Sequence, residues 1–195
     1  MSEKLSDLFN LELAWKRVKQ DISNRVFIKN PFEVNLIEED LEKYLNQIEK
    51  NIDENAWHPK PNYICNIPKE KGLIRPGSHL FINDRIVFSA LIAACLPAIY
   101  DTLEWAQGKR DFSYQLLNDF TNTGWFKNRF EGWENFRKQS LLKLQDGYSH
   151  VIIADITGYY ENIDIMTLIS DLRSTGAPGE AINLLSTCLK PLGAN

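Results

Sequence analysis

The sequence predicts an α+β fold in which helices outnumber strands, and three observations lead to it. Apolar residues recur with a helical period over residues 41–52. Residues 63–75 show a strand, a lysine-rich turn and a returning strand. Val151, Ile152 and Ile153 form a β-branched run, which predicts a further, buried strand.

The N-terminal part is predicted to be helical. Leu8, Leu11 and Trp15 begin one amphipathic segment, and Asn30-Pro31 separates it from a second one. The second segment carries an apolar stripe at helical intervals. The stripe consists of Leu41, Leu45, Ile48 and Ile52.

A β-hairpin and a long helix are predicted next. The hairpin joins strand 63–67 to strand 73–75 through a basic turn. The helix follows Asn83 and Asp84, either of which can cap it, and its nearly continuous apolar content indicates burial on most sides. Pro97 can kink this helix.

Further helices are predicted on both sides of the β-branched run. A long amphipathic helix precedes the run, and its aromatic stripe predicts core packing. The stripe consists of Phe126, Phe130, Trp133, Arg137, Leu141 and Leu144. After the run, Asp164 can cap a helix with an apolar face, and residues 176–179 separate that helix from a last one.

Composition and charge limit the class of protein. The 195 residues are 44% hydrophobic and 25% charged, which excludes a disordered chain. No apolar run approaches the roughly 20 residues of a membrane span, and the first residues do not resemble a secretory signal. We therefore expect a cytoplasmic protein that has no membrane partner.

The three cysteines predict neither a disulfide framework nor a zinc site. Cys65, Cys95 and Cys188 are far apart, odd in number and set among apolar neighbours, which is typical of reduced core residues. The three histidines show no metal-ligand spacing.

The distribution of charge is more informative than its sum. A net charge of −4 is unfavourable for binding nucleic acid, because such binding normally relies on lysine and arginine. Residues 60–85, however, carry five basic side chains and only two acidic ones. A locally basic surface is therefore expected around the hairpin.

Asp155 is placed at the C-terminal edge of the predicted third strand, just before Gly158. An ionised carboxylate there must be hydrated, paired or coordinated to a cation, because burying it alone is costly. Metal-dependent phosphoryl chemistry often keeps its ligands at strand ends. An aspartate that merely begins a turn or caps a helix fits the same pattern, and both interpretations remain open at this point.

In the order of its elements the chain resembles the bacterial reverse transcriptases, such as those of group II introns, retrons and phage-defence systems. Residues 63–76, which end in Arg-Pro, look like the fingers hairpin of that family. Residues 83–91 are similar to its Asp-Arg-led helix, and residues 154–164 look like its first catalytic block, the most specific of the three. The resemblance covers roughly residues 60–190.

The resemblance implies helix-rich fingers with a β-hairpin, followed by the start of a polymerase palm sheet. We accordingly expect an N-terminal helical extension over residues 1–59, a fingers-like region over 60–145 and the beginning of the palm over 146–195. The absence of any appended domain slightly favours a phage-defence role over intron mobility or retron DNA synthesis.

The resemblance also implies a magnesium site. Asp155 would match the aspartate that holds catalytic Mg²⁺, and the backbone carbonyl of Ile156 would be a further ligand. Magnesium prefers oxygen ligands, and two such ions in the complete enzyme can stabilise the attacking and leaving oxygens of a phosphoryl transfer.

The nucleotide pocket follows from the same resemblance. Tyr160 would match the aromatic residue under the incoming sugar, which favours dNTPs, and Arg75 would match the fingers residue that grips the triphosphate. Lys69 and Lys71 are further candidates for that grip. Each residue also has a purely structural interpretation. Tyr160 can be a core residue, Arg75 can be a solvated residue at a strand end, and Lys69 and Lys71 can belong to an ordinary solvated turn.

The chain departs from the family in one respect. The second source of carboxylates in the family is an aromatic-x-Asp-Asp hairpin, and the sequence contains no Asp-Asp pair. We therefore expect the N-terminal portion of an RNA-directed DNA polymerase, a nucleotidyltransferase that acts on an RNA template, a DNA or RNA primer and dNTPs, and that is inactive as this chain alone.

Two alternatives remain open. The chain can be a non-catalytic palm and fingers remnant that binds nucleic acid or a partner, or an unrelated α+β domain in which Asp155 is merely polar. In the polymerase and remnant interpretations, a palm sheet cut short would expose apolar surface, so we expect self-association or a second polypeptide.

Overall fold

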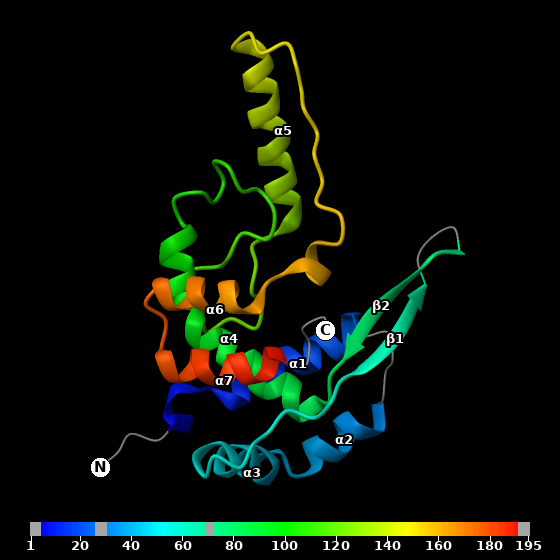
Figure 1. Ribbon diagram of the computed structural model, residues 1–195, viewed down its shortest axis with the longest axis vertical. Coiled ribbons are helices and arrows are strands. Elements are labelled where there is room, and N and C mark those ends of the chain that lie inside the picture. Colours follow the sequence, from blue (N-terminus) through cyan, green and yellow to red (C-terminus); the bar gives the residue numbers. More distant parts are fainter. Residues whose placement is uncertain (1–4, 26–30, 69–71, 191–195) are drawn as a thin grey trace.

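The computed structural model describes residues 5–25, 31–68 and 72–190, and its architecture is α+β, as predicted (Figure 1). A short 3-10 helix, η1, opens the described chain. The elements in order are η1 (Leu5–Leu8), α1 (Leu11–Arg25), α2 (Pro31–Glu39), α3 (Leu41–Asp53), β1 (Tyr63–Pro68), β2 (Ile74–His79), α4 (Ile82–Leu103), α5 (Arg129–Gln145), η3 (Tyr159–Asn162), α6 (Ile165–Ser174) and α7 (Gly179–Leu189).

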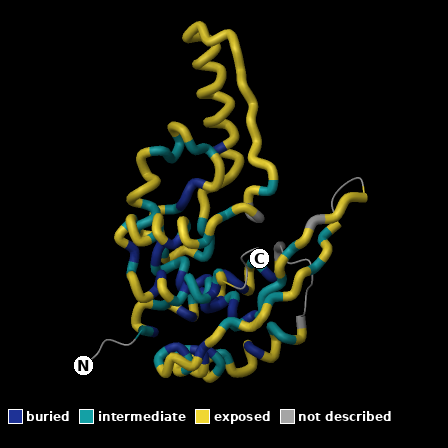
Figure 2. The backbone as a smooth tube through the Cα atoms, in the orientation of Figure 1, coloured by how far each residue is buried: buried dark blue, intermediate teal, exposed yellow. Residues whose placement is uncertain are grey.

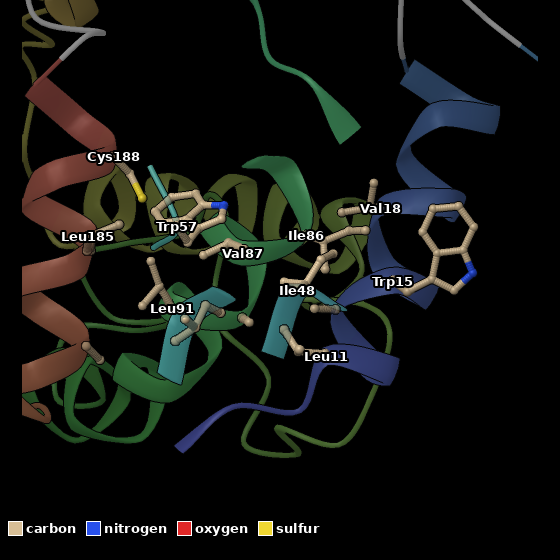
Figure 3. Packing of buried hydrophobic residues seen from close by; sticks show 14 of the residues in the cluster. Leu11, Trp15, Val18, Ile48, Trp57, Ile86, Val87, Leu91, Leu185 and Cys188 are labelled. Atoms are coloured by element: carbon tan, nitrogen blue, oxygen red, sulfur yellow. The ribbon is translucent and has the colours of Figure 1, made fainter. Parts of the chain in front are cut away.

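The hydrophobic core is organised around α4. This helix packs against α1 on one side and α7 on another, while α6 packs against α7 and α3 against η1. Figure 3 shows Ile86 of α4 beside Val18 of α1, and Val87 beside Trp57. The predicted apolar stripe of α3 is confirmed, because Leu45, Ile48 and Ile52 are all buried. One buried cluster therefore draws on helices from both ends of the chain.

The expectation that no apolar stretch approaches the length of a membrane span does not hold for α4. Its 22 residues and a mean hydropathy of 1.9 are enough to cross a membrane by length and composition, which holds for no other helix of the described chain. The same properties occur in the core helices of soluble proteins. Helix α4 packs against α1 and α7, and 39% of its apolar window is buried, so its length and composition alone are weak evidence for a membrane span.

The predicted β-hairpin is confirmed. Strands β1 and β2 pair antiparallel, with Tyr63 opposite His79 and Pro68 opposite Ile74. At the base, the ring of Tyr63 lies 5.4 Å from that of Phe81, the residue before α4. The hairpin projects from the helical body (Figure 1). Its turn, residues 69–71, lies outside the described chain.

The prediction of a third, buried strand is wrong. Val151, Ile152 and Ile153 are 77%, 93% and 91% exposed, and they lie in an extended segment without regular structure. A strand needs a neighbour for its backbone hydrogen bonds, and β1 and β2 form the only sheet of the described residues. The start of a palm sheet is therefore not formed.

The aromatic stripe of α5 is not core either. This helix projects from the body, and both α5 and the segment that follows it are exposed along almost their whole length (Figures 1 and 2). Gly132 is the only buried residue of α5. Midway along its length the helix contacts the preceding loop through Phe112 and Phe136, whose rings lie 5.8 Å apart.

Candidate functional site

Asp155 lies in the exposed segment between α5 and η3. Its side chain forms neither an ion pair nor a hydrogen bond with any side chain that the structure describes, a set that does not include those of Arg75 and Tyr160. Gly158 follows with a φ of 61° and a ψ of 35°, a left-handed conformation that glycine adopts without a steric penalty. The side-chain amide of Asn162 donates a hydrogen bond of 2.8 Å to the Gly158 carbonyl, which holds this turn.

The other candidate residues are not brought to Asp155 by any described contact. Ile156 is adjacent to it and exposed. Tyr160 lies in η3 and Arg75 in β2, opposite Ile67, but the side chains of both lie outside the described part of the protein. Lys69 and Lys71 lie outside the described residues altogether.

The described residues do not fit a two-magnesium site by themselves. Magnesium requires close to six oxygen ligands in octahedral geometry. Nowhere in the described ranges do three or more histidine, cysteine, aspartate or glutamate side chains come together as a possible metal site. Asp155 and the carbonyl of Ile156 would thus supply one carboxylate and one neutral oxygen, and we derive no chemical step through a metal ion.

Asp164 acts as predicted from the sequence. Its carboxylate accepts hydrogen bonds from the backbone N–H groups of Met166, at 3.2 Å, and Thr167, at 3.1 Å. The Thr167 hydroxyl also donates a hydrogen bond to this carboxylate, and this bond, followed by the two backbone bonds, holds the pKa of Asp164 below its usual value. The role of Asp164 is to cap α6.

The start of α4 is a buried polar junction. Asp84 is only 5% exposed, and its Oδ2 accepts a hydrogen bond of 3.0 Å from the backbone N–H of Lys60. Asn83 accepts a hydrogen bond from the Tyr44 hydroxyl, and Arg85 forms an ion pair with Asp21 of α1. These contacts fix α4 against three other segments of the chain.

The electrostatics of this junction follow from its burial. Burial raises the pKa of Asp84, and it raises that of Tyr44 to about 12, where the charges of Glu33 and Asp84 add to the effect. The predicted capping role of Asn83 or Asp84 is wrong, because Phe81 is the N-cap residue. Asp84 lies instead within the first helical turn, where the helix dipole favours a negative charge.

Sequence reasoning missed Arg17, which is 4% exposed. Its guanidinium donates hydrogen bonds to the backbone carbonyl of Phe120, at 2.8 Å, and to that of Asn122, at 2.7 Å. These bonds connect α1 to the loop that leads into α5. The partners are more than 100 residues away, so no local pattern in the sequence indicates them.

Comparison with known proteins adds no family assignment. No protein-family model matches the chain, and no curated protein sequence matches it. The resemblance to reverse transcriptases rests on three sequence blocks and their order along the chain.

Proposed function

We propose that this chain is the N-terminal portion of a cytoplasmic RNA-directed DNA polymerase, a reverse transcriptase. In its complete form the enzyme adds dNTPs to a DNA or RNA primer on an RNA template. The observation that carries the proposal is the exposed, extended, β-branched segment 151–153, which leads to Asp155 and has no strand beside it in the described ranges.

Exposure of this segment is energetically unfavourable. Burying a valine or isoleucine side chain stabilises a protein by about 1.5–3 kcal/mol. Three such side chains lie in water in a row, in the extended conformation that a neighbouring strand would bind. A strand from a further polypeptide segment would therefore be stabilised by both hydrophobic burial and backbone hydrogen bonds.

Such a strand would also complete the chemistry. Adjacent strands lie about 4.8 Å apart, which places a carboxylate at the end of the new strand close to Asp155. Two metal ions that act together in phosphoryl transfer are about 3.5–4 Å apart. The missing aromatic-x-Asp-Asp hairpin is a segment of this kind, and Mg²⁺ binding would depend on it.

The order of the preceding elements supports the same proposal. The hairpin β1–β2 projects from the body and carries Arg75 on its second strand. Helix α4 begins three residues after β2 and holds Asp84 and Arg85 in its first two turns. This is the sequence of hairpin and Asp-Arg helix on which the resemblance to the fingers rests.

A second candidate function is a non-catalytic remnant that binds nucleic acid or a partner chain. The observation that favours it is the lack of any group of three metal-binding side chains in the described ranges. A lone carboxylate can contact a bound chain, but it cannot organise two ions.

Primer extension on an RNA template with dNTPs and Mg²⁺ separates the two. We expect no synthesis by the 195-residue chain, and synthesis by a chain continued through its downstream coding sequence. In the continued chain, Asp155→Asn should abolish incorporation, whereas the matched change Asp164→Asn should preserve it because asparagine also caps helices. Tyr160→Ala should relax discrimination against rNTPs.

Three outcomes would count against parts of the proposal. Robust synthesis by the 195-residue chain would refute the claim that this chain is incomplete and inactive alone. Full activity of Asp155→Asn would remove the metal assignment. Salt-dependent binding of primer-template without synthesis by the continued chain would favour the remnant.

A further inference from the structure

Helix α5 exposes an apolar stripe that Arg137 interrupts at its centre. Phe130, Trp133, Leu141 and Leu144 are 63%, 58%, 56% and 53% exposed. Successive helical residues turn by about 100°, so these four residues and Arg137 lie within a sector of roughly 80°. The stripe therefore lies along one side of a helix that projects from the body (Figures 1 and 2).

The spacing of the stripe is symmetric. Its positions are separated by three, four, four and three residues, with Arg137 at the centre. A two-fold axis through Arg137 therefore places Phe130 opposite Leu144 of a second copy, and Trp133 opposite Leu141. A surface that is complementary to itself in this way is the requirement for a two-fold dimer interface.

We propose that α5 pairs with α5 of a second copy of this chain in an antiparallel arrangement. The two Arg137 side chains meet at the axis and repel each other, whereas the charges beside the stripe favour this orientation. Glu134 and Lys138 lie on the same flank of the stripe, and in an antiparallel helix pair the same flanks meet. Each Glu134 then faces the Lys138 of the second copy, and the pair forms twice.

A shallow hollow of about 370 Å³ lies on the flank that carries Glu134 and Lys138. It is lined by Glu134, Arg137, Lys138, Leu141, Leu142 and Gln145. Because this flank meets the same flank of the second copy in an antiparallel pair, the hollow can receive the Glu134 and Lys138 side chains of that copy.

The size of the contact sets the expected affinity. A single pair of 17-residue helices buries less than the standard interface of about 1,600 Å². We therefore expect a dimer that dissociates in the micromolar range. The proposal does not depend on Asp155 or on polymerisation, since α5 contributes no residue to that site.

Sedimentation velocity of the 195-residue chain from about 1 to about 100 µM tests the association. We expect a concentration-dependent monomer–dimer equilibrium. Trp133→Glu and Leu141→Glu should each weaken it by about tenfold or more, because they place a charge in the stripe. Met166→Glu, which adds the same charge at an exposed apolar position of α6, should leave it unchanged.

Two further measurements test the orientation. Glu134→Lys and Lys138→Glu should each weaken self-association, because like charges then meet twice, and a mixture of the two variants should form heterodimers. In a Cys65→Ser background, a short bismaleimide should link Arg137→Cys to itself. It should link Phe130→Cys only to Leu144→Cys.

Three results would overturn the proposal. The chain could remain monomeric over the whole concentration range, or Leu141→Glu could leave the dimer unaffected. The Phe130→Cys variant could also link to itself, which would indicate a parallel pair. A continued chain that is monomeric and shields Trp133 from a fluorescence quencher would assign the stripe to a downstream segment instead.

Discussion

The guanidinium carbon of Arg17 lies 4.2 Å from the centroid of the Trp125 ring. Together with its hydrogen bonds to the carbonyls of Phe120 and Asn122, this contact attaches the loop before α5 to α1. The side chain has no carboxylate partner in the described ranges, and its Nη1 atom is buried there without a hydrogen bond. A buried cation thus bonds to backbone oxygens and an aromatic face.

Arg17→Met should lower the free energy of unfolding by about 1–3 kcal/mol, because the carbonyl groups of Phe120 and Asn122 lose their donor in part-buried hydrogen bonds. The measurement is urea denaturation followed by circular dichroism. Lys16→Met is the matched control, since Lys16 is exposed and, among the residues that the structure describes, pairs only with Glu12, one helical turn away. We expect this control to change stability by no more than about 0.5 kcal/mol. Equal effects of the two substitutions would contradict the role of Arg17.

Gly132→Ala should destabilise the protein, although alanine normally favours a helix by about 1 kcal/mol. A Cβ atom at Gly132 would collide with the backbone carbonyl oxygen of Phe112, which cannot move as a flexible side chain can. We expect a loss of about 1–3 kcal/mol in the same assay. Gly179→Ala in α7 is the control, because nothing lies within 4 Å of its Cβ position, and it should be neutral or stabilising.

Asp84 should make stability fall as the pH rises. Burial raises its pKa in the folded protein above the ordinary value of 3.8, so the folded state keeps a proton that the unfolded chain has already released. Stability is therefore lost between 3.8 and the raised folded pKa. Asp84→Asn removes this proton, so its stability relative to the wild type should increase through that window and then remain constant.

Urea denaturation of both proteins at a series of pH values from about 3.5 to about 7 measures this difference. Asp101→Asn, an exposed position on the same helix, is the control. A stability difference between Asp84→Asn and the wild type that does not vary with pH would refute the expected linkage.

Cys188 should react slowly with alkylating reagents. Its burial, together with the negative charge of Asp84, raises the pKa of the thiol to about 12, so the reactive thiolate is scarce at neutral pH. Mass spectrometry after timed iodoacetamide treatment should find the half-buried Cys65 modified first. Rapid modification of Cys188 in the folded protein would contradict its placement, and denaturant should make the cysteines react alike.

Local signals predicted local structure well. The hairpin, the buried stripe of α3 and the Asp164 cap depend on residues close together in the sequence, where period and hydrogen-bonding chemistry decide the outcome. The same signals could not determine what covers a surface. The apolar pattern of α5 correctly predicted a helix, but whether its stripe is buried depends on segments far away in the chain or outside it.

The same limit applies to the candidate site residues: local sequence patterns do not determine contacts between distant segments. Asp155 follows a β-branched run, and such a run favours a β-strand. A strand forms, however, only where a neighbouring strand supplies backbone hydrogen bonds. Arg17 gave no signal, because its carbonyl partners are backbone groups and could belong to any residue. Predictions from sequence therefore failed where a contact between distant segments decides the structure.

The uncovered run Val151–Ile153 has a consequence for handling the protein. Short segments of high β-propensity without proline or charge are templates for intermolecular cross-β aggregation, and in this chain the run is accessible in the folded state as well. On prolonged incubation at high concentration, the purified 195-residue chain should therefore slowly form aggregates that bind thioflavin T. Ile152→Lys should delay this aggregation.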